Sequence, residues 1–285
     1  MRIQSFYHQD TSTYTHWLED TEHHLSLIVD PVLDFDQKSG RTSTGFIDAI
    51  LGQLAQQDSR LVYVLETHAH ADHLTAADYL RRKFGADIVI GQPIKKVQGI
   101  FREVFNEPQS FVADGHQFDV LVAEGDSLIL GNHQIRVLAT PGHTPACVSY
   151  VVDDQLAFIG DTLFAPDTGT ARCDFPGGDA NTLYDSIQKL FALGDEARLY
   201  LCHDYPPDGR ELISSVTVAE QRHQNIHVRD SISREEFVAL RTERDRGLEM
   251  PRLILPSLQV NIRAGALPEA EDNGVAYLKL PLNRF

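Results

Sequence analysis

Four side chains that can bind a metal ion lie within six residues of one another: His68, His70, Asp72 and His73. They follow directly after the apolar segment 61–65. In a helix, residues two positions apart point about 200° apart, so the first two histidines would diverge. In an extended segment, residues two apart share a face, so both would point the same way. The spacing therefore predicts a metal site at the carboxyl end of a strand. The alternative is a polar loop that is merely rich in histidine.

Three more candidate ligands, His143, Asp161 and His203, also come directly after apolar runs. The runs that precede them, each a predicted strand, are residues 134–138, 156–159 and 199–202. Taken alone, each has a simpler interpretation: a turn histidine, a helix or turn cap, and a surface residue. Ligands of α/β sheets gather at the carboxyl ends of strands. We therefore expect these three side chains to join the first four.

The elements that must position these ligands are short and regular. Strands alternate with helices up to about residue 90, which predicts an α/β layered architecture. A helix should follow the histidine motif and stop at Gly85. Further along, we expect hairpins 127–130 with 134–138 and 147–152 with 156–159, then helices at 180–193, 211–225 and 233–246. The remaining residues are expected to form a Pro-punctuated, strand-like tail.

Composition narrows the class of function. The 285 residues are 42% hydrophobic and carry a formal charge of −16, so the partner is not expected to be a nucleic acid or an anionic membrane surface. An anionic small substrate would need a local arginine or a metal to receive it. No run of 18 apolar residues occurs, the first residues lack a secretion signal, and the three cysteines form no paired framework. These observations favour a cytoplasmic protein.

The ligand motifs together resemble a known family. His68-x-His70-x-Asp72-His73, Pro141-Gly142-His143-Thr144, Gly160-Asp161-Thr162 and His203 are similar, in order and spacing, to the signature of the metallo-β-lactamase superfamily. The resemblance covers residues 25–205. It implies a four-layer αββα sandwich with the metal site at one edge between the two sheets. We expect one such domain over residues 1–285, with a C-terminal extension from about residue 226.

The full superfamily ligand set allows two metal ions. One would be held by His68, His70 and His143, the other by Asp72, His73 and His203, with Asp161 as the bridge. Two close cations suit hydrolysis, because they acidify a bridging water and clamp both oxygens. Superfamily membership alone therefore implies a dizinc thioester hydrolase similar to glyoxalase II.

A second resemblance implies different chemistry. The segment 169–179, with its Arg-x-Asp-Phe sequence at 172–175, is similar to that of the persulfide dioxygenases, the ethylmalonic-encephalopathy protein family. So are His203-Asp204-Tyr205 and the later Asn261 and Arg263. In that family one Fe(II) is held by two histidines and one aspartate, a set that leaves coordination positions open for O₂. Carried over, the ligands are His68, His143 and Asp161, while His70, Asp72, His73 and His203 orient ligands and carry protons.

The reaction that this resemblance implies takes glutathione persulfide, O₂ and water to sulfite and glutathione, in sulfide detoxification. The expected substrate contacts are Arg172, Tyr205, Thr144, Asn261 and Arg263. The planar fork of Arg172 suits a carboxylate, although a salt bridge to Asp174 is the alternative. Thr144 is a weaker candidate, because a threonine after a turn histidine often only caps. The family also implies a homodimer.

The chain departs from the animal persulfide dioxygenases near the substrate. The loop between Asp161 and Arg172 is longer, Thr170 stands in place of a cysteine, and His227 lies where those proteins have a substrate-binding arginine. These departures leave the ligand set intact. They bear on which thiol carries the persulfide. A third interpretation, a degenerate fold kept as a binding module, would require lost ligands, and every ligand position is filled.

Overall fold

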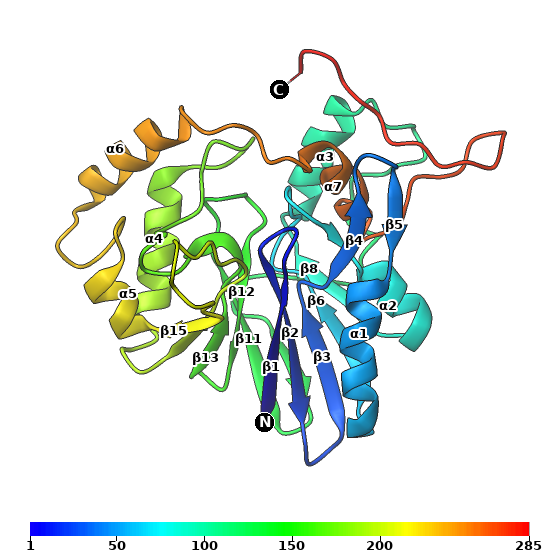
Figure 1. Cartoon of the computed structure of the whole chain (residues 1–285). Coiled ribbons are helices and arrows are strands. Elements are labelled where there is room, and N and C mark those ends of the chain that lie inside the picture. The colour runs from blue at the N-terminus through cyan, green and yellow to red at the C-terminus, as the bar shows by residue number, and fades with distance from the viewer. Residues whose placement is uncertain (285) are drawn as a thin grey trace.

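The structure, a computed structural model, describes residues 1–284. Two six-stranded β-sheets face each other, and each carries helices on its outer surface (Figure 1). Helices α1, α2, α3 and α7 lie on one side of the sheet pair, and α4, α5 and α6 lie on the other (Figure 1). This arrangement is the predicted αββα sandwich.

The first sheet contains the amino-terminal strands, in the order β1-β2-β3-β6-β8-β9. Strands β3, β6, β8 and the edge strand β9 run parallel, so helices connect them. The strands are β1 Arg2–His8, β2 Thr13–Asp20, β3 Leu25–Val29, β6 Arg60–Leu65, β8 Asp87–Gly91 and β9 Val120–Val122. The helices on this side are α1 Gly45–Leu54, with the 3-10 turn Ala55–Gln57, then α2 Ala77–Phe84, α3 Ile94–Val104 and α7 Ile254–Asn261.

The second sheet has the order β10-β11-β12-β13-β14-β15 and is antiparallel except where β13 and β14 pair. Its strands are β10 Ser127–Leu130, β11 His133–Ala139, β12 Val148–Val152, β13 Leu156–Phe158, β14 Arg198–Tyr200 and β15 Ser215–Thr217. The outer helices are α4 Ala180–Phe191, α5 Val218–Gln224 and α6 Arg234–Asp245. A 3-10 turn, Gly160–Thr162, follows β13.

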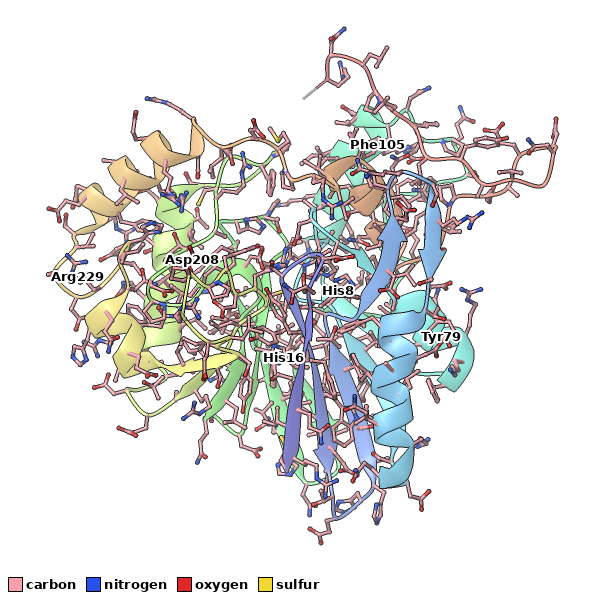
Figure 2. All side chains as sticks on the ribbon, in the orientation of Figure 1. His8, His16, Tyr79, Phe105, Asp208 and Arg229 are labelled. Carbon is pink, nitrogen blue, oxygen red and sulfur yellow. The ribbon has the colours of Figure 1, made fainter. Side chains whose placement is uncertain are left out.

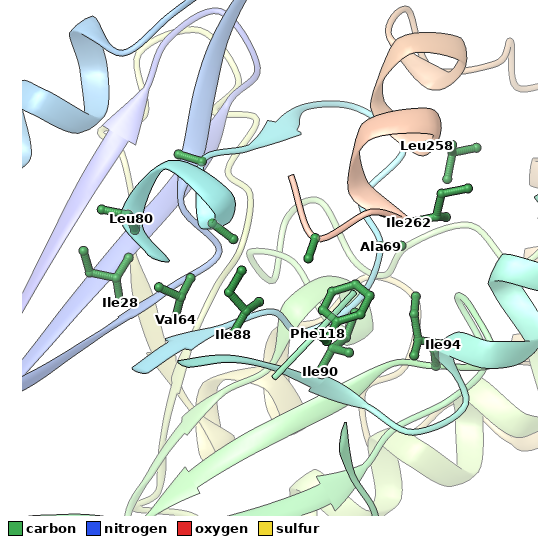
Figure 3. Packing of buried hydrophobic residues seen from close by; sticks show 14 of the residues in the cluster. Ile28, Val64, Ala69, Leu80, Ile88, Ile90, Ile94, Phe118, Leu258 and Ile262 are labelled. Carbon is green, nitrogen blue, oxygen red and sulfur yellow. The ribbon is translucent and has the colours of Figure 1, made fainter. Parts of the chain in front are cut away.

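Alternating side chains of the first sheet feed two different cores. Val64 and Ile88 point toward the helices, where Leu80 and Ile94 pack (Figure 3). The next residue along β6, Leu65, faces the second sheet instead. Because both faces of these strands are covered, their sequences read as continuous apolar runs. That explains the unbroken hydrophobic run before the histidine motif.

A small three-stranded sheet holds the far end of that motif. Its strands are β5 Arg41–Ser43, β4 Val32–Asp36 and β7 Leu74–Thr75, in this order. Strand β7 begins directly after His73, so the segment between β6 and β7 is fixed at both ends. Helix α7 packs against β7 from the other side. The metal motif is therefore a short connection between two paired strands.

Most predicted elements are confirmed, and two are wrong. The helix after the motif ends at Gly85, and both hairpins form as predicted. The helix expected at 211–225 begins only at Val218, because residues 215–217 pair as edge strand β15 and Thr217 caps the helix with Glu220. The expected strand-like tail contains helix α7 instead. Across the described residues, none of the helices has the length and apolar character needed to cross a membrane.

Candidate metal centre

The histidine motif begins at the carboxyl end of β6 in the first sheet and leads into β7 of the small sheet. Its candidate ligands are buried. His68, His70 and His73 are each 1% exposed or less, and Asp72 is 26% exposed through its side chain. The other three predicted ligands come from the second sheet side: His143 after β11, Asp161 in the turn after β13 and His203 after β14. All seven side chains meet in two adjoining groups. The expectation that the strand ends converge is met.

The first group consists of His68, His143 and Asp161, whose candidate ligand atoms all lie within 4.8 Å of one another. Asp161 Oδ2 is 3.9 Å from His68 Nε2 and 3.7 Å from His143 Nε2. Two imidazoles and one carboxylate therefore face a common point. This donor set suits iron as well as zinc.

The second group consists of His70, Asp72, His73 and His203. His203 Nε2 is 3.3 Å from Asp72 Oδ2 and 3.4 Å from Asp161 Oδ1. The two oxygens of Asp161 thus face different groups. Asp161 has the placement of a bridging ligand, which is what the two-metal expectation requires.

Hydrogen bonds fix which nitrogen of each histidine is free. His143 Nδ1 donates to the carbonyl of Arg172 at 2.7 Å, and His203 Nδ1 to the carbonyl of Ser12 at 3.2 Å. A carbonyl only accepts, so each Nδ1 carries the proton and each Nε2 keeps its lone pair. His70 is the reverse case, because its Nε2 lies 3.0 Å from Asp30 Oδ1. Such partners orient metal-binding imidazoles.

The free atoms have no hydrogen-bond partner among the described residues, although they are buried. They are His68 Nε2, His70 Nδ1, His73 Nε2, His203 Nε2, Asp72 Oδ2 and Asp161 Oδ1. Leaving one such polar atom unpaired costs about 1–3 kcal/mol. Six of them in one place are explained by a cation that they share. The residues present therefore fit a metal ion.

Two buried carboxylates lie behind His70. Burial disfavours a charged imidazole, but Asp30 and Glu66 outweigh it and raise the pKa of His70 well above its usual value. Asp30 also accepts hydrogen bonds from the amide and hydroxyl of Thr67, and Glu66 accepts one from Thr75. These two acids hold the ring so that Nδ1 points at the ligand cluster.

Two glycines allow the ligand-bearing turns to approach closely. A Cβ on Gly160, which has a φ of +51°, would lie 2.7 Å from Thr67 Oγ1. A Cβ on Gly142 would lie 2.4 Å from the backbone of Leu183 in α4. Each glycine precedes a ligand, Asp161 and His143. Larger residues there would push the ligand out of the cluster.

A pocket of about 390 Å³ opens on the first group. The ligands His143 and Asp161 line it, together with Asp72 of the second group. Its walls include aromatic residues and three arginines: Phe164, Phe175, Tyr205, Arg172, Arg241 and Arg244. Tyr205, predicted to contact substrate, stacks on His203 with ring centroids 5.8 Å apart. The pocket combines an apolar wall, cations and metal ligands, as small-molecule sites do.

Arg172 lines the pocket, but its guanidinium is already bonded. Its Nε and Nη2 lie 2.6 and 2.7 Å from the two oxygens of Asp174, and its Nη1 donates to the carbonyl of Glu249. The guanidinium also sits 4.9 Å from the centre of the Phe175 ring. The structure therefore shows the salt bridge that was the alternative interpretation of this residue.

Two other predicted substrate contacts do not reach this pocket. Asn261 donates to the carbonyls of His70 and His73 and accepts from the amide of Thr75, each at 2.8–2.9 Å. Arg263, two residues after α7, pairs with Glu107 at 2.5 Å and lines a different pocket. Asn261 thus braces the metal-binding segment, and Arg263 is held by an ion pair. A substrate contact by either residue stays a prediction.

Thr144 has the capping role that was its alternative. Its hydroxyl accepts a hydrogen bond from the amide of Ala146 at 3.3 Å and lies 3.1 Å from Cys147 Sγ. It borders a small apolar cavity rather than the pocket with the arginines. A direct substrate contact by Thr144 stays a prediction.

Sequence reasoning missed four residues of the site: Asp30, Glu66, Arg241 and Arg244. Asp30 directly follows strand β3, so the same strand-end rule that found the ligands would have indicated it. Glu66 stands inside the histidine motif itself. The two arginines come from α6, far along the chain, and carry no local signal.

Comparison with known proteins agrees with this geometry. Residues 13–203 match the metallo-beta-lactamase superfamily. A probable metallo-hydrolase of Burkholderia pseudomallei is 49% identical, with 99% of each chain covered. Glyoxylase B2 of Dictyostelium discoideum is 45% identical, covering 99% of this chain and 97% of the relative. The mitochondrial persulfide dioxygenase ETHE1 of Mus musculus is 31% identical, covering 92% and 88%.

A solved structure shows the same family likeness. The crystal structure of ETHE1 from Myxococcus xanthus is similar with a TM-score of 0.73 and 32% identity, covering 93% of this chain and 100% of the other. The matched segment contains all seven candidate ligands and every strand of the two six-stranded sheets except the edge strands β1 and β15. The chain belongs to the metallo-beta-lactamase superfamily.

Proposed function

We propose that the protein is an Fe(II) persulfide dioxygenase, which converts glutathione persulfide, O₂ and water to glutathione and sulfite. The observation that carries the proposal is which ligand group borders the pocket. His143 and Asp161 line it, whereas His70, His73 and His203 are 0% exposed. A substrate in the pocket therefore meets the two-histidine, one-carboxylate group. The persulfide dioxygenase among the relatives supports the same assignment.

In this proposal His68, His143 and Asp161 hold the iron. Fe(II) would supply electrons and open coordination positions for sulfur and O₂. The aromatic wall of Phe164 and Phe175 keeps water from the reacting sulfur. Adding O₂ and water to the outer sulfur, with cleavage of the S–S bond, would release glutathione, sulfite and two protons. Asp72, whose side chain lines the pocket, would accept a proton.

The second candidate is a dizinc thioester hydrolase. It is favoured by the complete second ligand group and by Asp161, whose oxygens face both groups. Relatives named as a probable metallo-hydrolase and a glyoxylase also support it. Two metals with a bridging water would suit attack on a thioester.

Metal content and oxygen use separate the two candidates. The metals of the protein as purified are counted, and O₂ uptake is then followed with glutathione persulfide. The proposal predicts about one iron per chain and O₂ consumption in step with sulfite formation. About two zinc ions per chain, with anaerobic turnover of S-lactoylglutathione and no O₂ uptake, would refute it.

Two further properties belong to the proposal. We propose a cytoplasmic location, which the three buried, free cysteines Cys147, Cys173 and Cys202 support. We also propose a homodimer, because the resemblance implies one. Light scattering on the purified chain tests the second point, and a monomer at micromolar concentration would contradict it.

A further inference from the structure

Three arginines reach one pocket in a chain with a net charge of −16. An anionic ligand is repelled by such a chain as a whole, so a local cation must receive it. Whether an arginine can do so depends on whether its guanidinium is already bonded to a carboxylate of the protein. The three arginines differ in this respect.

Two of the three arginines are already paired with carboxylates of the protein. Arg172 forms the bidentate pair with Asp174 described above. Arg241 is 1% exposed and donates from Nε and Nη2 to Asp245 Oδ1, at 2.9 and 2.6 Å. Its Nη1 donates to the carbonyl of Thr170 at 2.9 Å. Breaking either pair to bind a substrate would leave a carboxylate behind, and for the buried pair the cost is high.

Arg244 is the third arginine, and it differs from the other two. It is exposed, and no carboxylate among the described residues forms an ion pair with its guanidinium. It lies three residues after Arg241 in α6, so both project from the same face of the helix. The Arg241–Asp245 pair and the hydrogen bond to Thr170 fasten that face to the pocket loop.

We infer that Arg244 receives a carboxylate of the thiol substrate, while the sulfur lies at the His143 and Asp161 end of the pocket. The substrate class is then a thiol with a carboxylate at its far end. This inference rests on the proposed function and deepens it. It moves the role predicted for Arg172 to a residue that is free to perform it.

Guanidinium suits this role because its planar fork can pair with both carboxylate oxygens. Arg172 forms part of the pocket wall. It stacks on Phe175, and its hydrogen bond to the carbonyl of Glu249 links the loop before α4 to the segment after α6. Asp72 and Asp161, the carboxylates that line the pocket, belong to the metal cluster. Among the described residues that line the pocket, Arg244 is therefore the arginine whose charge is left for a substrate carboxylate.

The test measures binding rather than turnover. Glutathione and its diethyl ester are titrated calorimetrically, without O₂, into the iron-loaded wild type, Arg244→Gln, Arg244→Lys and Arg246→Gln. Arg246 is the matched control, because it lies two residues further along, outside the pocket lining, and pairs with Glu243. It changes the net charge of the protein by the same amount.

We expect Arg244→Gln to weaken glutathione binding about 10- to 100-fold, the range of a charge-assisted hydrogen bond. Binding of the diethyl ester should be unchanged, Arg244→Lys should recover part of the loss, and Arg246→Gln should behave as wild type. The inference is overturned if Arg244→Gln binds glutathione as wild type does, if it weakens acid and ester equally, or if wild type binds no glutathione.

This readout separates the inference from the proposed function. Calorimetry needs no reaction, so the expected binding pattern in a protein that takes up no O₂ would refute the dioxygenase and keep the role of Arg244. If the wild type took up O₂ and Arg244→Gln bound glutathione as the wild type does, the role of Arg244 would be refuted and the dioxygenase would be kept.

Discussion

The two ligand groups contain the same residue types but differ in access. The group of His68, His143 and Asp161 borders a pocket, and its carboxylate faces both imidazoles. In the other group His203 and His73 are fully buried, and only Asp72 reaches the pocket. A substrate in the pocket can therefore meet His143 and Asp161 of the first group, but only Asp72 of the second.

This difference separates binding a metal from using it. Both groups present buried lone pairs without partners in the described chain, so both can hold a cation. Only the first can also present that cation to a molecule in the pocket. We therefore expect variants of the first group to remove metal and activity together, and variants of the second to tune them.

The largest effect is expected at the residue that the groups share. Asp161→Ala removes the carboxylate that faces His143 on one side and His203 on the other. Iron affinity should fall by more than roughly 100-fold and activity should be lost with it. Metal analysis after dialysis and an oxygen electrode measure the two quantities. Full activity in this variant would refute the site assignment.

A matched pair of histidine variants tests the comparison itself. His143→Ala should lose iron and activity as Asp161→Ala does, since it removes a first-group ligand. His203→Ala should keep iron within about 10-fold of wild type and lose only part of the activity, as expected for a residue that acts through ligands. Equal metal loss in both variants would show that the groups act as one two-metal site.

The next effect concerns the brace behind the motif. Asn261→Ala removes three buried hydrogen bonds to the backbone of the metal-binding segment. The free energy of unfolding should fall by about 2–4 kcal/mol, measured by urea denaturation of the metal-free protein. Asn273→Ala, an exposed asparagine in the tail, is the control and should change it by less than about 0.5 kcal/mol. If the two variants were equally stable, Asn261 would not be a brace.

The sequence predicted that the seven side chains converge, because their signal is local. The motif at 68–73 needs only the period of an extended chain, and each remaining ligand follows its own apolar strand. The layers followed from the same runs, since strands covered on both faces are apolar throughout. Convergence of the strand ends then required no knowledge of distant contacts.

The pocket was predicted less well, because distant segments complete it. Arg172 has the side chain for a carboxylate, but Asp174 and Glu249 occupy it, and a sequence does not show which partner wins. Arg244 lies about seventy residues away on a charged helix, where an exposed arginine has no distinguishing local signal. Asn261 was assigned to the substrate although α7 turns it toward the motif.

The smallest expected effect is a pH dependence of the free energy of unfolding. It comes from His227, which accepts a hydrogen bond from the amide of the pocket residue Thr170. Burial, and then the charges of Arg241 and Arg244, lower the pKa of His227 to about 4 from its usual 6.5. The unfolded chain thus binds a proton that the folded chain does not between these values. Stability from this residue is present above pH 6.5 and is lost as the pH falls toward 4.

His227→Asn removes the titrating ring but keeps an acceptor for the amide of Thr170. The loss of unfolding free energy between pH 7 and pH 5 should shrink by about 1–2 kcal/mol. His16, on β2 and labelled in Figure 2, should keep part of the dependence, because burial lowers its pKa to about 4 as well. The exposed His24→Asn is the control. An unchanged profile in His227→Asn would contradict the assignment.

The central claim is that one iron is used, in the group that borders the pocket. Anomalous diffraction at the iron and zinc edges, from crystals of the iron-loaded protein, tests it most directly. We expect one iron peak, bound by His68 Nε2, His143 Nε2 and Asp161 Oδ2. Two metal peaks bridged by Asp161, or a single peak on His73 and His203, would contradict it.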